Sequence, residues 1–253
     1  MFYQALTLGS MNVSPESRRI DDRVGYIVTV IGIPSAFLLH GYVGFIFGSV
    51  KANAWWSTPL MPIVFLFSAM VSGIAAVMLL YDLSCRLRKQ AVDMLCLDTI
   101  AKYLFYVFLI DFSLEMLDLI HRIYEADESF RSLDFMVHTR LFTSQVVLQI
   151  ILGTCVPLAL LGLAQVMNLG ERLRRCLYAV AGLLTLMGIF AMRWNVVIGG
   201  QLFSKSYLGY TTYKLEFAAR EGLLPSIGLM LLPLGILWAL IKLLPPWEER
   251  QVM

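Results

Sequence analysis

Charged residues are scarce in this chain of 253 residues: Asp, Glu, Lys and Arg make up 15% of it, whereas 58% is hydrophobic. Because soluble domains are nearer a quarter charged, this composition excludes an ordinary water-soluble globule and a disordered protein. The formal net charge is only +2, which lacks the positive excess of a nucleic-acid-binding surface. We therefore expect a lipid bilayer around the chain and no nucleic acid among its partners.

Clustered metal ligands are also missing. The four cysteines contain no Cys-x-x-Cys pair, and the histidines at positions 40, 121 and 138 lie far apart. Iron–sulfur clusters need grouped thiolates, and zinc sites need short ligand spacings. We expect no haem and no iron–sulfur cluster of the chain's own, so redox chemistry would depend on another component. The first residues also lack the pattern of a signal peptide, so the first apolar segment is expected to be retained.

Long apolar segments, in contrast, are abundant. A helix needs about 20 residues to cross a hydrocarbon core about 30 Å thick. Six segments qualify or nearly qualify, at residues 24–50, 59–81, 103–120, 141–167, 176–192 and 223–241. The sequence therefore predicts an all-α, polytopic membrane helix bundle with about six transmembrane helices over residues 24–244. A segment of residues 1–23 precedes this domain, and a tail of residues 245–253 follows it.

Basic residues predict the orientation of these spans. They gather in tight clusters at residues 18–23, 86–89 and 172–175, all on the same side of the membrane as the N-terminus. Basic residues on the other side are fewer in total and mixed with acids. The positive-inside rule then places both termini in the cytoplasm. We expect the protein in the cytoplasmic (inner) membrane of a bacterium.

The third segment differs from the others because it contains Asp111, Glu115 and Asp118. At 100° per residue these acids lie at about 0°, 40° and −20°, on one face of a helix. A charged side chain at the centre of a span costs roughly 2.5–3.5 kcal/mol, so such residues turn inward. One interpretation is a proton path or the polar wall of a substrate pocket. The alternative is that Asp118 neutralises Arg122 and the other two acids hydrogen-bond to neighbouring helices.

Other polar residues are expected in the outer half of the membrane. His40 and Tyr42 in the first span could hydrogen-bond to a quinone carbonyl or a quinol hydroxyl, although a lone His on an apolar helix is often structural. The further polar residues expected at this depth are Asp118, His121, His138, Arg140 and Arg193. Their convergence predicts a site near the outer leaflet.

The connector at residues 193–222 is long, aromatic and basic. We expect it to lie on the outer interface or to dock a partner, with a plain amphipathic surface helix as the alternative. Arg193 is expected to pair with an acid such as Glu216 or Asp118. The residues expected to dock a partner or form ion pairs are Arg193, Gln201, Lys205, Lys214 and Arg220.

Several stretches carry a family resemblance: Gly32-Ile-Pro, His40-Gly-Tyr-Val-Gly, Trp56 with Leu60-Met-Pro, and above all Arg193-Trp-Asn-Val-Val-Ile-Gly-Gly-Gln-Leu-Phe-Ser-Lys. Together they resemble the NrfD and polysulfide reductase membrane-subunit family over residues 32–247. The resemblance implies a membrane subunit without cofactors of its own that exchanges electrons and protons between quinone and a peripheral, ferredoxin-type iron–sulfur subunit. That subunit would lead to a molybdopterin or cytochrome subunit.

The same resemblance implies two four-helix bundles and a quinone pocket near the outer face. Tyr42-Val43-Gly44 matches a pocket motif of the family, with Val where Thr is frequent. Longer members carry further N-terminal helices, so a complete quinone site is expected either to need another chain or to be altered here. A proton or small-solute transporter that uses the acidic residues is one alternative function, and a cofactor-free membrane anchor is another.

Overall fold

The computed structural model describes residues 15–53, 55–125, 134, 137–139, 141–167, 169–202, 217 and 222–243. The regular elements in these ranges are all helical, which confirms the predicted fold class. They are α2 (Pro15–Gly48), α3 (Met61–Leu87), α4 (Met94–Glu125), the π-helix η1 (Phe142–Cys155), α6 (Val156–Val166), α7 (Glu171–Trp194), the short π-helix η2 (Asn195–Gly199) and α8 (Leu223–Leu243).

Five segments of the described helices are long and apolar enough to cross a bilayer: Arg23–Gly48, Met61–Leu87, Phe142–Val166, Glu171–Gly199 and Leu223–Leu240. Each coincides with one predicted span. The sixth predicted span, at residues 103–120, lies in α4, which is 32 residues long. α4 is not among the five apolar segments because it contains too many charged residues. Its length of about 48 Å nevertheless exceeds the thickness of the hydrocarbon core. The architecture is that of a polytopic membrane helix bundle.

The chain forms two compact units, one of residues Phe37–Thr212 and one of Met1–Ala36 with Tyr213–Met253. The described part of the unit with the termini contains residues 15–36 of α2 and all of α8. Apolar side chains on these helices are largely exposed: Tyr26 is 72% exposed and Leu229 is 69% exposed. Such surfaces are suited to lipid rather than to water.

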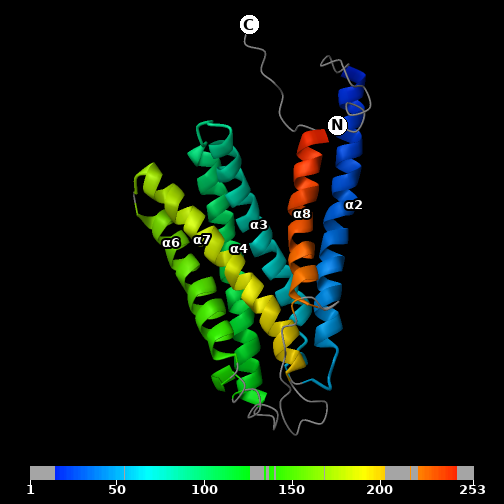
Figure 1. Cartoon of the computed structure of the whole chain (residues 1–253), viewed down its shortest axis with the longest axis vertical. Helices are drawn as coiled ribbons and strands as arrows, with labels where there is room; N and C mark the ends of the chain where they lie inside the picture. The colour runs from blue at the N-terminus through cyan, green and yellow to red at the C-terminus, as the bar shows by residue number, and fades with distance from the viewer. Residues whose placement is uncertain are drawn as a thin grey trace. The chain divides into compact units, whose positions relative to one another are not determined.

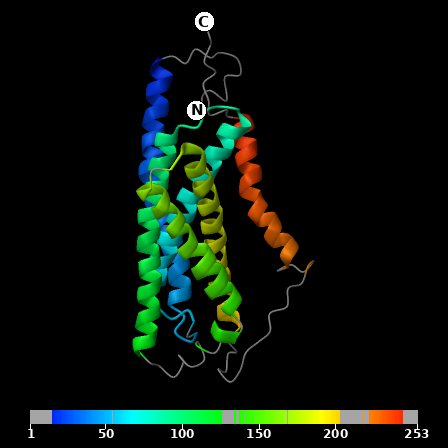
Figure 2. The same cartoon turned by 90° about the vertical axis from the view of Figure 1, so that its left-hand side faces the viewer.

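The larger unit is built on α3, α4, α6 and α7, which lie side by side in both views (Figure 1, Figure 2). α3 contacts α4 and α7, and α7 also contacts α6 and η1. Short connections make α3 antiparallel to α4 and α6 antiparallel to α7. The apolar core between them includes Val71, Ala75, Met78, Leu97, Ala101, Leu104, Phe108, Leu161 and Ala181.

Glycines set the closest approaches between helices in this unit. A Cβ atom on Gly153 of η1 would lie 2.2 Å from the Cα of Gly188 in α7, so neither position has room for a side chain. A Cβ atom on Gly44 would lie 2.6 Å from the Cα of Pro62, where the end of α2 meets the start of α3. Small residues allow helix backbones to touch in membrane proteins.

One end of the larger unit is tied together by ion pairs. Asp82 of α3 binds Arg175 of α7 and also Arg86, whose Nε lies 2.8 Å from its carboxylate. Asp98 of α4 binds Arg174 at 2.9 Å and accepts a hydrogen bond of 2.9 Å from the Tyr178 hydroxyl. Along α3, Asp82 lies about 30 Å from Met61 at the other end. The two ends of the unit are therefore about one hydrocarbon thickness apart.

The predicted connector at residues 193–222 begins later than expected. Arg193 lies within α7, and the helix continues as η2 to Gly199 because Asn195, Val196 and Gly199 are buried among other helices. Gln201 follows on the surface and is exposed. Lys205, Lys214, Glu216 and Arg220 lie outside the described residues, as do Arg140 and the side chain of Arg122.

Candidate functional site

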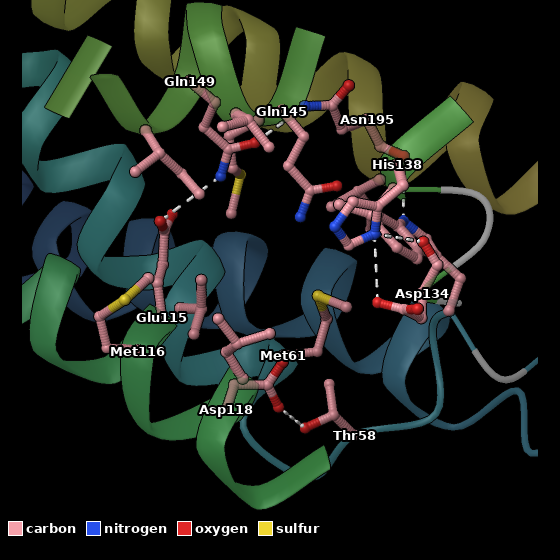
Figure 3. A pocket seen from close by; sticks show the side chains of 18 residues that line it. Thr58, Met61, Glu115, Met116, Asp118, Asp134, His138, Gln145, Gln149 and Asn195 are labelled. Carbon is pink, nitrogen blue, oxygen red and sulfur yellow. Dashed lines mark hydrogen bonds and ion pairs between the residues drawn. The ribbon is translucent and has the colours of Figure 1, made fainter. Parts of the chain in front are cut away.

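A cavity of about 400 Å³ lies at the end of the larger unit that is opposite the ion pairs. The start of α3, the end of α4, η1 and the junction of α7 with η2 surround it (Figure 3). Its size is within the range of small-molecule sites, which are mainly apolar with a few polar groups. Its apolar lining consists of Met61, Val64, Met116, Leu119, Val137, Val146, Ile150, Met192 and Val196.

The acids of α4 face the protein. Glu115 and Asp118 line the cavity, and Asp111, one turn earlier, is only 1% exposed. Asp118 accepts a hydrogen bond from the Thr58 hydroxyl, and a carboxylate oxygen of Glu115 accepts one of 3.4 Å from Gln149 Nε2 (Figure 3). The spacing of these acids predicted that they share one face of the helix. In the structure, that face of α4 is turned toward the other helices.

The bond between Glu115 and Gln149 belongs to a longer chain of hydrogen bonds. Gln149 Oε1 accepts a bond of 2.9 Å from Asn195 Nδ2, and the backbone oxygen of Asn195 accepts one of 3.0 Å from Trp55 Nε1. Trp55 precedes Thr58 by three residues, and Thr58 bonds to Asp118. These side chains join four parts of the chain around the cavity. We call this set the polar belt: Trp55, Thr58, Glu115, Asp118, Gln149 and Asn195.

The π-helix η2 explains how the loop before α3 is held. An amide in a π-helix bonds to the carbonyl five residues back, so the change from α-helix leaves carbonyls available to other donors. Trp55 and Trp56 donate their indole N–H groups to the carbonyls of Asn195 and Val196, the second at 2.6 Å. A Cβ atom on Gly200 would lie 2.1 Å from the Trp56 ring, so glycine is required there.

Arg193 lies deeper in the unit, on the α3 side. Its Nη2 donates hydrogen bonds to the Phe65 carbonyl at 3.0 Å and to the Ser68 hydroxyl at 2.7 Å, and its guanidinium carbon lies 4.0 Å from the Phe65 ring centre. The acid that interacts electrostatically with it is Asp111. The sequence had suggested Glu216 or Asp118, but Glu216 lies outside the described residues and Asp118 bonds to Thr58.

The predicted residues are only partly brought together. His138 lines the cavity, and its Nδ1 lies 2.9 Å from the Asp134 backbone oxygen and 3.1 Å from its carboxylate. His40 and Tyr42 lie near the end of α2 and are not among the residues that line the cavity; Tyr42 is 62% exposed. His121 is exposed on the last turns of α4.

Sequence reasoning missed several polar residues of the cavity, among them Gln145, Gln149 and Asn195. Gln145 and Gln149 are four residues apart in a span that contains no charge, which is a pattern of polar residues facing a helix neighbour. The oxygens Gln145 Oε1, Asn195 Oδ1 and Asp111 Oδ1 are buried without a hydrogen-bond partner in the described structure. Within the same residues, no group of three His, Cys, Asp or Glu side chains could hold a metal ion.

The long apolar helices and the acid-lined cavity between them define the class: a multi-pass membrane protein. The profile of the family described as "Polysulphide reductase, NrfD" matches residues 6–205. The chain belongs to this family, which confirms the resemblance found in its sequence.

One curated relative is a selenate reductase subunit of Mesobacillus selenatarsenatis. The two sequences are 29% identical over 234 residues, which cover 89% of this chain and 52% of the relative. The chain therefore spans about half the length of this relative. No solved structure matches the chain.

Proposed function

We propose that this chain is the quinone-reactive subunit of a multisubunit oxidoreductase in the bacterial cytoplasmic membrane. It binds quinone or quinol in the cavity and exchanges electrons with a peripheral, ferredoxin-type iron–sulfur subunit, which connects to a molybdopterin or cytochrome subunit. The observation that carries this proposal is an apolar cavity with carboxylates in its wall, inside a membrane subunit of the NrfD family. The relative's name, as a subunit of a selenate reductase, supports a complex.

The cavity suits the headgroup of a quinone. Its apolar wall matches the ring, and three methionines, Met61, Met116 and Met192, can adapt to the ring's outline. Carboxylates can accept hydrogen bonds from quinol hydroxyls, and the Gln145 side chain can donate to a quinone carbonyl. Two-electron chemistry of a quinone also transfers two protons, so acid–base groups beside the ring are required.

The acids of α4 supply such groups in a line. Asp111, Glu115 and Asp118 span about 10 Å along the inner face of the helix. In the proposed function they carry protons between the quinone and the protein interior, as is common for acids within membrane spans. The electrons pass to the partner subunit, for which Gln201, Lys205, Lys214 and Arg220 are the proposed docking residues. Arg193 is held inside the unit by Ser68 and Phe65.

The test is quinone-coupled turnover of the purified complex. Glu115→Gln removes a proton acceptor from the cavity while keeping the side chain's shape. We expect turnover with quinone to fall about 100-fold, as for loss of a general base, while turnover with a soluble viologen dye, which bypasses this subunit, is unchanged. Glu171→Gln, which changes an exposed carboxylate at the start of α7, is the matched control and should have no effect.

A double variant, His40→Ala with Tyr42→Phe, tests the location that the sequence suggested. If it abolishes quinone-coupled turnover while Glu115→Gln does not, quinone binds beside α2 rather than in the cavity. If neither variant affects turnover, the chain is an anchor without a quinone site. Proton uptake by liposomes that contain the chain alone, without any redox partner, would instead support the transporter.

A further inference from the structure

Basic side chains gather at the ion-paired end of the larger unit, where the turn between α3 and α4 and the start of α7 lie at the same end (Figure 1, Figure 2). Ion pairs from Asp82 and Asp98 to α7 hold these two segments together. The acids of residues 82–98 and 170–178 are Asp82, Asp93, Asp98 and Glu171, so basic residues are in excess. We call the basic residues of these two ranges the basic rim: Arg86, Arg88, Lys89, Arg172, Arg174 and Arg175.

The acids of this end leave many of the basic donors without a counter-charge. Asp82 is shared by two guanidinium groups, those of Arg86 and Arg175, and both bind it through Nε. Asp93 accepts hydrogen bonds from two backbone N–H groups at the start of α4. A guanidinium has five N–H donors, so donors remain for a further acceptor. The Arg86 side chain is 56% exposed and can present them to the surroundings.

The start of α7 favours an anion for two reasons. Arg174 Nη1 binds Asp98 at 2.9 Å, but Arg174 Nε is buried and has no hydrogen-bond partner in the described part of the chain. A buried donor on a charged group destabilises the protein when it is left without an acceptor. In addition, residues 171–175 contain three arginines and one glutamate, although cations are unfavourable at the positive end of a helix dipole.

Lys89 has an unusual backbone conformation in the basic rim. Its φ is 54°, and it is the residue with a positive φ among the described non-glycine residues. It follows the C-cap residue of α3, a position at which glycine is preferred because a Cβ atom is disfavoured in this conformation. The exposed lysine is thus present in place of the residue that local stability favours. Strain of this kind is typical of functional positions.

Exposed leucines lie beside the basic residues in both segments. Leu87 is 76% exposed, and Leu83 and Leu173 are each 50% exposed. This end of the unit lies about one hydrocarbon thickness from the other end, at the level of the lipid headgroups. A free phosphate ion would contact the cations and leave the leucines in water. A phospholipid places its phosphate on the cations and its acyl chains on the leucines, so the combination favours a lipid.

We propose that the basic rim binds the headgroup of an anionic phospholipid. The phosphate oxygens accept hydrogen bonds from the guanidinium and ammonium groups of the rim, and the acyl chains lie along Leu87 and Leu173. Arginine suits this role because its planar fork of donors matches the geometry of a phosphate. Basic clusters beside membrane spans attract anionic lipids in general. The site is at the opposite end of the unit from the cavity and does not rest on the proposed function.

The experiment measures lipid binding to the full chain by native mass spectrometry from a non-ionic detergent. The probes are dioleoylphosphatidylglycerol, dioleoylphosphatidylcholine with the same acyl chains, and glycerol 3-phosphate, which has no acyl chain. We expect phosphatidylglycerol to bind at least about tenfold more tightly than phosphatidylcholine, because only its headgroup carries a net negative charge. Glycerol 3-phosphate should not bind at the same concentrations. Equal affinities for the two lipids would overturn the proposal.

Two variants test the residues of the rim. Arg172→Gln and Lys89→Gly each remove one exposed charge, and each should weaken binding of phosphatidylglycerol about fivefold, with little change for phosphatidylcholine. Lys89→Gly should also leave the denaturation temperature unchanged or raise it, because glycine is favoured at a φ of 54°. Weaker lipid binding without lower stability is a result that a purely structural role would not produce.

Lys51→Gln is the matched control, since it removes an exposed charge at the opposite end of the unit. An equal loss of binding in this control would reduce the effect to net charge and overturn the site. Binding of glycerol 3-phosphate as tightly as phosphatidylglycerol would replace the lipid with a free anion. Unchanged phosphatidylglycerol binding in the double variant Arg172→Gln with Lys89→Gly would also overturn the site. Loss of another subunit from the purified complex of this variant would then assign the basic rim to a protein partner.

Discussion

Arg193 shows how a charge is accommodated inside this membrane protein. It is held by the Ser68 hydroxyl, the Phe65 carbonyl and the Phe65 ring, with the Asp111 carboxyl as its electrostatic partner. A buried charge is tolerated only when its surroundings replace the lost water. Removing either partner therefore leaves the other uncompensated.

We predict that Arg193→Met destabilises the protein by about 3–5 kcal/mol, since it leaves Asp111 and Ser68 without their partner. The double variant Arg193→Met with Asp111→Asn should recover part of this loss. The measurement is thermal unfolding of the purified protein in detergent. Arg172→Met, at an exposed position at the start of the same helix, is the control. Equal effects of the variants at 193 and 172 would contradict the prediction.

Single residues also show what sequence patterns omit. The periodicity of Asp111, Glu115 and Asp118 was sufficient to place them on one face, because spacing along a helix determines direction. The partners of these acids, Thr58 and Gln149, could not be predicted in the same way. They come from other elements, and their positions depend on how the helices pack.

At the scale of elements, the contact between η1 and α7 shapes the wall of the cavity. Gly153 and Gly188 let the two backbones touch. Gln149 lies four residues before Gly153, and Asn195 lies seven residues after Gly188. The π-helical geometry of η1 and η2 widens the backbone. Residues Gln149 and Asn195 therefore face each other across a junction that an apolar sequence pattern does not reveal.

We predict that Gly188→Ala separates these two elements. The added Cβ atom would lie 2.5 Å from the Cα of Gly153, so the backbones must move. Overpacking of this kind costs about 1–3 kcal/mol or more, and it should lower the denaturation temperature. Gly73→Ala, at a position in α3 with open space, should be neutral or stabilising. Equal stability of the two variants would refute this account of the contact.

At the scale of the whole molecule, the distribution of charge follows the membrane. The larger unit has an ion-paired end around Asp82 and Asp98 and a cavity end around Glu115, with an apolar core between them. The basic clusters at residues 86–89 and 172–175 both belong to the ion-paired end. By the positive-inside rule, we predict that this end faces the cytoplasm.

The orientation gives a direct prediction for cysteine labelling. In a variant without the four native cysteines, Ser57→Cys should react with a membrane-impermeant maleimide on intact cells, because Ser57 is exposed beside the cavity end. Lys89→Cys, in the turn after α3, should react only after the cells are permeabilised. The opposite pattern would place both termini outside the cytoplasm.

The amino-acid sequence by itself determined the membrane class, five spans that coincide with long apolar helices, the family and the shared face of the α4 acids. All of these follow from local properties, namely hydrophobic length, helical period and short motifs. Only the tertiary structure decided that α3, α4, η1 and η2 enclose a cavity lined by Glu115 and Asp118, and that Asp111 is the acid that interacts electrostatically with Arg193. Those facts depend on which side chains from distant segments meet, and that is settled by close packing, by the glycine contacts and by the π-helical turns.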